Sequence, residues 1–162
     1  MRITVFQYMT TSREDKEKEM KIKKLTNTAK TPTRGTDGAA GYDLYADLDG
    51  RITIEPFTVA KIPTNIAMEI PKGYFGAIYA RSGMATKKGL RPAQGTAVID
   101  EDYRGNIIVP LFNQTDKPHI IDPGERIAQI VFQQYATVEF EEVDELDGTE
   151  RGEGGFGSTG RK

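Results

Sequence analysis

The sequence predicts an all-β domain, and two patterns in the 162-residue chain support this prediction. From Thr31 onward, prolines and glycines separate runs of only a few residues. Within these runs, apolar residues either alternate with polar ones or form short continuous stretches, and both patterns are typical of β-strands. Many short strands divided by regular turn signals indicate a sandwich or barrel. From Thr31 onward, only residues 84–88 favour a helix, and that helix would be short.

The predicted strands follow one another along the chain. Ile66, Met68 and Ile70 alternate with Ala67 and Glu69, as expected for a half-buried strand. Pro110 lies inside a later apolar run and predicts an edge position or a bulge, because proline cannot donate to a ladder. The strands are expected at 20–25, 66–70, 74–80, 107–112, 127–132 and 138–141.

The composition divides the chain into three parts, which we expect at residues 1–20, 21–143 and 144–162. The first is an N-terminal extension with a mixed charge run at 12–18, predicted to be a frayed helix or flexible. The second is the β domain. The third is a C-terminal arm in which five of the chain's 17 glycines fall between Gly152 and Gly160. Its composition alone favours a disordered terminus, in which Arg151 and Phe156 are the only large recognition groups.

Composition also excludes several kinds of site. The formal net charge of −2 predicts no basic face, so we expect no direct nucleic-acid binding. The chain has no cysteine and one histidine, His119, which excludes thiolate and histidine-cluster metal sites and leaves oxygen ligands, which suit Mg²⁺. No apolar run has membrane-spanning length and the N-terminus lacks a signal-peptide core, so we expect a cytoplasmic protein, or a nuclear one in a eukaryote.

Residues 95–105 form the most informative stretch. The apolar run Ala97-Val98-Ile99 leads into an acidic turn at 100–102, and the next apolar run starts at Ile107, a pattern that predicts a β-hairpin. Such a loop places backbone donors and acceptors, which can bind the edge of a planar heterocycle, beside carboxylates that can take a proton from water. From chemistry alone, either Asp100 or Asp102 can be the base, and an ordinary acidic turn is the alternative.

The same stretch, Val-Ile-Asp-Glu-Asp-Tyr-Arg-Gly at 98–105, resembles the third motif of the trimeric dUTPases, the nucleotidohydrolases of deoxyuridine triphosphate. Four further segments match that family in its order, and five motifs in order are specific although each alone is weak. They lie at 39–44, 81–83, 124–129 and 151–160. The resemblance implies a distorted jelly-roll-like β-barrel whose glycine-rich C-terminal arm closes the active site.

The resemblance also implies a reaction, in which dUTP and water give dUMP and pyrophosphate by attack on the α-phosphorus. Asp100 would be the base, and Asp43 would bind Mg²⁺ through water. Tyr103 would pack beneath the deoxyribose, where a 2′-hydroxyl would clash, and Phe156 would stack on the uracil. The remaining substrate contacts implied are the guanidinium groups of Arg81 and Arg151, the backbone edge of Ala97, Val98 and Ile99, and Ser82, Gly83, Gln129, Gly157, Ser158 and Thr159.

Two positions depart from the family pattern. Many members have glycine where this chain has Ala97, and alanine does not adopt positive φ freely. Many have asparagine where Gln94 stands, so Gln94 is a candidate contact on a longer arm.

The resemblance implies a homotrimer whose sites are shared: motifs one, two and four from one chain, the hairpin from a second and the arm from the third. Two alternatives remain open. One is a dCTP deaminase of the same fold, and the other is a nucleotide-binding regulatory protein that uses the N-terminal extension as a docking element.

Overall fold

The computed structural model describes residues 19–155, in which strands predominate over one six-residue helix. This confirms the predicted all-β class. The expectations for residues 1–18 and for Phe156 to Thr159 lie outside the described residues. The elements are β1 Lys21–Lys24, β2 Thr33–Arg34, β3 Tyr42–Tyr45, β4 Ile52–Ile54, β5 Val59–Pro63, β6 Ile66–Glu69, β7 Tyr74–Tyr79, α1 Ser82–Lys87, β8 Leu90–Pro92, β9 Ala97–Ile99, β10 Ile108–Asn113, β11 His119–Ile121 and β12 Arg126–Gln134.

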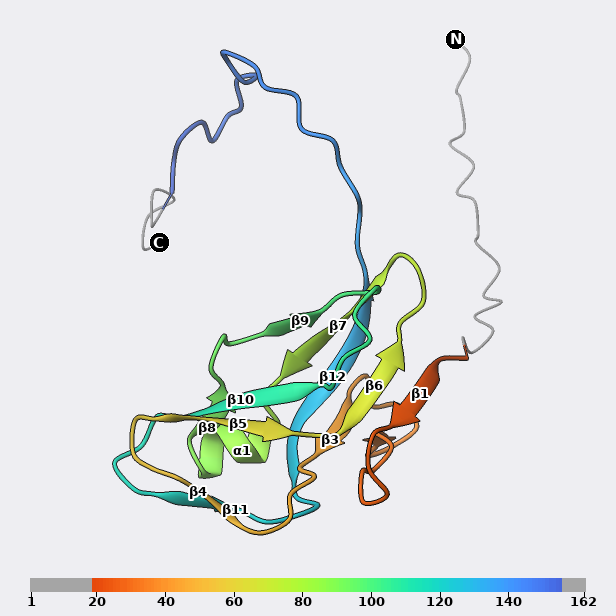
Figure 1. Cartoon of the computed structure of the whole chain (residues 1–162). Helices are drawn as coiled ribbons and strands as arrows, with labels where there is room; N and C mark the ends of the chain where they lie inside the picture. The colour runs from red at the N-terminus through yellow and green to blue at the C-terminus, as the bar shows by residue number, and fades with distance from the viewer. Residues whose placement is uncertain (1–18, 156–162) are drawn as a thin grey trace.

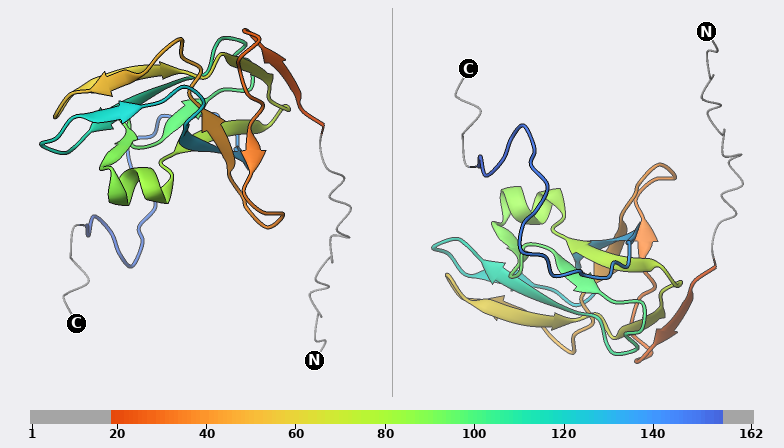
Figure 2. Two further views of the ribbon diagram at one scale, coloured as in Figure 1. Left: turned by 90° about the horizontal axis from the view of Figure 1, so that it is seen from below. Right: turned by 90° about the horizontal axis from the view of Figure 1, so that it is seen from above.

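The strands form four antiparallel sheets (Figure 1). The largest has five strands in the order β2-β3-β12-β7-β9, and the second has three in the order β5-β10-β8. The pairs β1-β6 and β11-β4 complete the domain. Within the described residues these sheets surround one core without joining into a single closed sheet (Figure 2). The fold is therefore the expected distorted jelly-roll-like β fold, and no closed barrel is present in this part of the chain.

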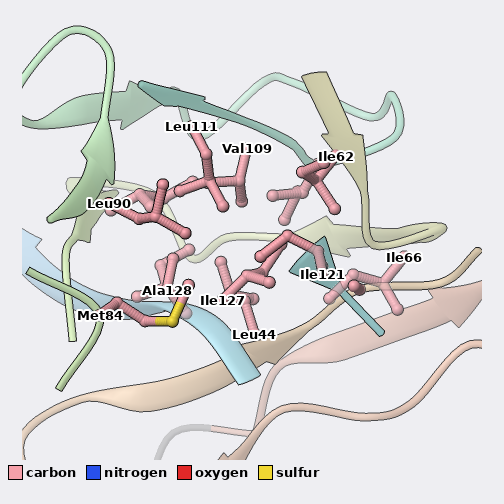
Figure 3. Close-up of a cluster of buried hydrophobic side chains, with 14 of the residues drawn as sticks. Leu44, Ile62, Ile66, Met84, Leu90, Val109, Leu111, Ile121, Ile127 and Ala128 are labelled. Carbon is pink, nitrogen blue, oxygen red and sulfur yellow. The ribbon is translucent and has the colours of Figure 1, made fainter. Parts of the chain in front are cut away.

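The core lies between the two larger sheets. Val109, Leu111 and Ile62 extend from β10 and β5 toward Leu44 and Ile127 of the other sheet (Figure 3). Each of these five side chains is fully buried. Burying such a side chain contributes about 1.5 to 3 kcal/mol. The apolar runs at 107–112 and 127–132 therefore form strands whose core-facing side chains are buried by the opposite sheet, whereas Ile108 on the other face of β10 is 42% exposed.

The predicted hairpin at 95–105 is wrong in its pairing. Val98 of β9 pairs with Ala77 of β7, whereas β10 pairs with β5 and β8 in the other sheet. The acidic segment is therefore a loop between two sheets, hereafter the β9–β10 loop. Alternation and turn residues predict that a strand exists, but a run of three residues does not specify which strand it pairs with.

Pro110 lies in the central strand of its sheet and not at an edge, against the prediction. The carbonyl of Pro110 accepts a hydrogen bond of 2.8 Å from the amide of Ala93, so its backbone groups face the β8 side. Because β8 ends at Pro92, the ladder on that side has already finished. The missing N–H of Pro110 therefore costs no strand–strand hydrogen bond.

The described chain has no strand after Gln134, so the strand expected at 138–141 is absent from it. After Tyr135, whose amide still donates to the carbonyl of Gly73, residues 136–155 leave the body of the domain as an extended segment (Figure 1). Phe140 is 97% exposed and Leu146 is 89% exposed. An alternating segment forms a strand only beside another strand, and this chain offers none here. No helix among the described residues is long and apolar enough to cross a membrane.

Candidate active site

Asp43 lies at the centre of a charged cluster at one end of β3. Arg81 Nε donates to Asp43 Oδ1 at 2.6 Å, and Arg126 Nη1 donates to Oδ2 at 3.1 Å. The Asp43 side chain is only 12% exposed, whereas that of Arg126 is 50% exposed. Each guanidinium uses one nitrogen in these ion pairs and has five N–H donors in total, so further donors remain on both arginines. The cluster can therefore bind an anion without losing its internal ion pairs.

A β-bulge in β12 places two side chains of this strand near Asp43. The register between β12 and β3 shifts between Arg126 and Ala128, and both Ile127 and Ala128 are buried. In a regular strand Arg126 and Gln129 would project to opposite faces, because the side-chain period is two. The extra residue of the bulge brings the side chains of Arg126 and Gln129 to the same face of the strand. Gln129 therefore lies opposite Asp43, and Arg126 contacts the Asp43 carboxylate. Bulges of this kind redirect side chains at functional sites.

Gln129 is itself closely held. Its Nε2 donates to the carbonyl of Ala80 at 3.0 Å, directly before Arg81. A Cβ on Gly41 would lie 3.1 Å from Gln129 Cδ, so a larger residue at position 41 would require the Gln129 side chain to move. Three of the five motifs, at 39–44, 81–83 and 124–129, thus meet in one place. Ser82 is exposed and Gly83 is half-buried at the start of α1 beside this cluster.

The turn before β12 is tied to the end of α1. Lys88 Nζ donates to Glu125 Oε1 at 2.5 Å, and Glu125 Oε2 accepts the amide of Asp122 at 3.0 Å. The carbonyl of Glu125 also accepts the amide of Ala46, just after β3. These bonds connect β3, α1 and β12, and they hold the residue directly before Arg126.

β9 is the edge strand of the five-stranded sheet. Its inner edge pairs with β7 over Gly76, Ala77 and Ile78, and no described strand covers its outer edge. Ala97 does not have a positive φ, so the absence of glycine there introduces no backbone strain. Gln94 lies in the exposed turn before β9.

The β9–β10 loop is anchored through Glu101. The amide of Gly73, in the β6–β7 turn, donates to its carboxylate. The Tyr135 hydroxyl also bonds to Glu101, and this hydrogen bond, with burial and the negative charges of the loop, raises the pKa of Tyr135. Glu101 is thus occupied by these contacts, whereas the neighbouring Asp100 is exposed to solvent. A pocket of about 580 Å³ lies beside it, lined by Phe75, Val98, Asp100, Glu101, Asp102 and Tyr135.

Tyr103 folds back over its own loop. Its hydroxyl donates to the carbonyl of Asn106 at 2.9 Å. Its ring lies against Gly105, where an added Cβ would be 2.6 Å from Cζ. A smaller concavity of about 190 Å³ opens between β9 and this ring, lined by Val98, Ile99, Asp100, Tyr103, Asn106 and Ile108.

Arg151 does not join these groups within residues 19–155. Its Nε donates to the carbonyl of Gly154 at 2.7 Å, inside a turn of the extended arm. Arg126, which contacts Asp43, was not predicted as a site residue. Arg126 lies inside the motif at 124–129, and its positive charge beside a glutamate in that motif was the available signal.

The comparisons with known proteins agree with this geometry. The sequence profile of the dUTPase family matches residues 27–160. A deoxyuridine 5'-triphosphate nucleotidohydrolase of Desulfitobacterium hafniense is 52% identical over 132 residues, which cover 81% of this chain and 87% of that protein. The corresponding protein of Hydrogenobaculum sp. is 47% identical, over 87% of this chain and 97% of its own length.

A solved structure extends the comparison to the fold. The G164S mutant dUTPase of Staphylococcus bacteriophage 80alpha, described with dUpNHpp, superimposes with a TM-score of 0.80 at 31% identity. The superposition covers 88% of this chain and 98% of the phage chain. The fold and the matches therefore place this chain in a class of nucleotide-hydrolysing proteins with a β fold. This chain belongs to the dUTPase family, as its five motifs indicated.

Proposed function

We propose that the protein hydrolyses dUTP to dUMP and pyrophosphate. A water oxygen forms a bond to the α-phosphorus, the bond from that phosphorus to the bridging oxygen breaks, and pyrophosphate leaves. Asp100 accepts the proton of the attacking water. In a cell this reaction limits uracil incorporation into DNA and supplies dUMP for dTMP synthesis.

The observation that carries this proposal is the position of Asp100 directly after the free edge of β9. β9 is an edge strand whose other side is not covered by any described strand. Uracil presents an acceptor–donor–acceptor edge, and in this proposal backbone groups of residues 97–99 on that side bind it. The amino group of cytosine would face a backbone donor there, which is a costly buried mismatch. One short segment thus combines base selection with an exposed carboxylate. An ordinary carboxylate is a weak base, so positioning and charge stabilisation supply most of the acceleration.

The Asp43 cluster is proposed to bind the triphosphate, through Arg81, Ser82, Gly83 and Gln129. Its donor set also suits Mg²⁺. The described residues contain no group of three carboxylate or histidine ligands, and Asp43 stands alone among its arginines. Mg²⁺ retains several waters and takes phosphate oxygens, so one carboxylate that accepts from a metal-bound water is sufficient. Bound there, the ion would neutralise phosphate charge while Arg81 orients the chain of phosphates.

We infer a homotrimer with shared sites from the separation of the site residues. The arm leads away from the domain, so Arg151 does not reach the Asp43 cluster of its own chain. The side chains of Phe140 and Leu146 are almost fully exposed and pack on no apolar surface of the described chain. A neighbouring subunit would provide that surface. In this arrangement Arg151 and Phe156 to Thr159 of one subunit close the site formed by two others, and Gln94 lies near the base.

Pyrophosphate release from dUTP, dCTP, dTTP and UTP, with and without Mg²⁺, tests the proposal. Asp100→Asn should bind dUTP normally and lose about 10²- to 10⁴-fold in kcat, the contribution of a general base. Asp102→Asn is the matched control, because it removes an equal charge from the same loop. If Asp100→Asn kept more than half of the wild-type kcat, Asp100 would not be the base.

The same reactions distinguish the alternatives. Ammonia released from dCTP would indicate the deaminase, and tight nucleotide binding without turnover of any substrate would indicate a regulatory protein.

A further inference from the structure

Three segments of the chain meet beside the β9–β10 loop. Asp47 follows β3, Asn65 lies in the bend between β5 and β6, and Asn106 ends the loop. The amide of Asp47 donates to the carbonyl of Pro63 at 2.9 Å, and that of Ile107 donates to Ile66 at 2.9 Å. Backbone hydrogen bonds therefore fix the chain on both sides of Asn65, to Asp47 through Pro63 and to Ile107 through Ile66.

The side chains of these residues form a continuous chain of hydrogen bonds. Asn65 Nδ2 donates to Asp47 Oδ2 at 2.9 Å, and Asn65 Oδ1 accepts from Asn106 Nδ2 at 2.7 Å. The hydroxyl of Thr26 donates to the same Asp47 oxygen. Asp47 is 9% exposed, so this chain begins at a nearly buried carboxylate. It ends at Asn106, whose carbonyl accepts the Tyr103 hydroxyl.

Asn65 occupies an uncommon backbone conformation. Its φ is 49°, and only Phe57 among the other non-glycine residues described has a positive φ. This region is unfavourable for most residues because Cβ comes too close to the following carbonyl oxygen, although asparagine tolerates it better than others. The side chain of Asn65 is bonded at both its donor and its acceptor end, so the bend is held in this conformation by the network itself. Strain that surrounding contacts maintain is characteristic of functional regions.

Asn106 is also held at a cost. Its Oδ1 is buried and has no hydrogen-bond partner among the described residues. An unsatisfied buried acceptor is uncommon in folded proteins. The orientation of Asn106 is thus determined by its single bond to Asn65.

We propose that Asp47, Asn65 and Asn106 form a positioning network that holds Tyr103 for selection of deoxyribose over ribose. The network acts through the Asn106 carbonyl, which fixes the phenol hydroxyl from one side while Gly105 supports the ring from beneath. This inference rests on the proposed function, and within it on the proposed place of Tyr103 beneath the sugar. A 2′-hydroxyl is rejected only if the ring cannot move aside. Rigidity of Tyr103, and not merely its presence, then determines the selectivity.

The test compares kcat/KM for dUTP and UTP in two network variants. Asn65→Gly keeps the positive φ and removes the side-chain bonds to Asp47 and Asn106. Asn106→Ala keeps the backbone carbonyl and removes the side-chain amide. Each should lower the dUTP-over-UTP ratio by about 3- to 10-fold, the factor of one hydrogen bond, while kcat for dUTP changes by less than about twofold. Thr115→Ala is the control, because it removes comparable bonds to Asn113 and Lys117 at the β10–β11 turn. It should lower thermal stability without changing the ratio.

A double-mutant cycle separates positioning from general destabilisation. In a Tyr103→Phe background the hydroxyl bond is absent, so Asn65→Gly should have no further effect on the ratio. An unchanged ratio in both network variants, when Tyr103→Ala loses selectivity, would overturn the positioning network and leave the role of Tyr103 intact. An unchanged ratio in Tyr103→Ala would overturn both. A wild-type protein that does not hydrolyse dUTP would instead refute the proposed function.

Discussion

Replacing Gly105 with alanine would add a methyl group where the ring of Tyr103 lies. The new Cβ would be 2.6 Å from Cζ and closer still to the hydroxyl oxygen, well inside ordinary contact. The end of the phenol must therefore move by roughly 1 Å to reach normal van der Waals distance. The φ of Gly105 is not positive, so the backbone accepts alanine and the effect is confined to the ring.

That movement would break the hydrogen bond from Tyr103 to the Asn106 carbonyl, which is 2.9 Å long. Loss of one such bond costs about 0.5 to 1.5 kcal/mol, or roughly 2- to 12-fold in an equilibrium. We expect the dUTP-over-UTP ratio of kcat/KM to fall by about this factor. Thermal unfolding should show a loss of stability of similar size.

Two comparisons make the assay specific. Gly50→Ala is the control, because a Cβ there meets no atom within 4 Å. In a Tyr103→Ala background the clash disappears, so Gly105→Ala should then change neither quantity. A Gly105→Ala protein with wild-type selectivity and stability would show that the ring is not held where the structure places it.

Three further predictions concern other parts of the molecule. Asp43→Asn should lower the free energy of unfolding by about 1 to 3 kcal/mol in urea titrations, because two arginines lose their partner; a larger loss in Arg126→Met, whose side chain is half-exposed, would contradict this. Burial opposes ionisation of Asp47, but hydrogen bonds from Thr26, Asn65 and Thr28 and the charge of Lys24 outweigh it and lower its pKa below 3.8. The free energy of unfolding of the wild-type protein should therefore exceed that of Asp47→Asn by its full amount above about pH 5, and the difference should decline as pH falls through that lowered pKa. A difference that grew with acidification would refute the assignment. Deleting residues 150–162 should leave Tm and oligomeric state unchanged and lower kcat by about 10- to 100-fold, as expected for losing a charged contact from Arg151; full activity would show that the arm has no role in turnover.

The sequence predicted the elements whose pattern is local. β7 and β12 are continuous apolar runs between turn residues, and α1 includes most of the expected helical segment. It did not predict which strands pair, as β9 shows, because pairing depends on edges that form only when distant segments meet. The segment at 138–141 failed for the same reason, since its alternation requires a neighbouring strand.

The site shows the same division. Asp43 and Arg81 were chosen from their motifs and lie in contact. Asn65 was not recognised, because an asparagine between two apolar runs is an ordinary turn signal and its positive φ is visible only in three dimensions. Its bonds to Asp47 and Asn106 join residues 18 and 41 positions away, a separation that no local pattern reports.

The bulge in β12 makes chain length as important as chemistry in this strand. Arg126 and Gln129 share one face only because an additional residue lies between their regular positions. Many single substitutions at Ile127 or Ala128 would change packing while leaving that phase intact. Deleting either residue would remove the extra residue and shift the phase of the strand by one. If the residues after the deletion kept their pairing with β7, Arg126 would face away from Asp43; if Arg126 kept its contact with Asp43, the β12–β7 pairing would be lost. Evolution and protein engineering can therefore vary the side chains here far more freely than the number of residues.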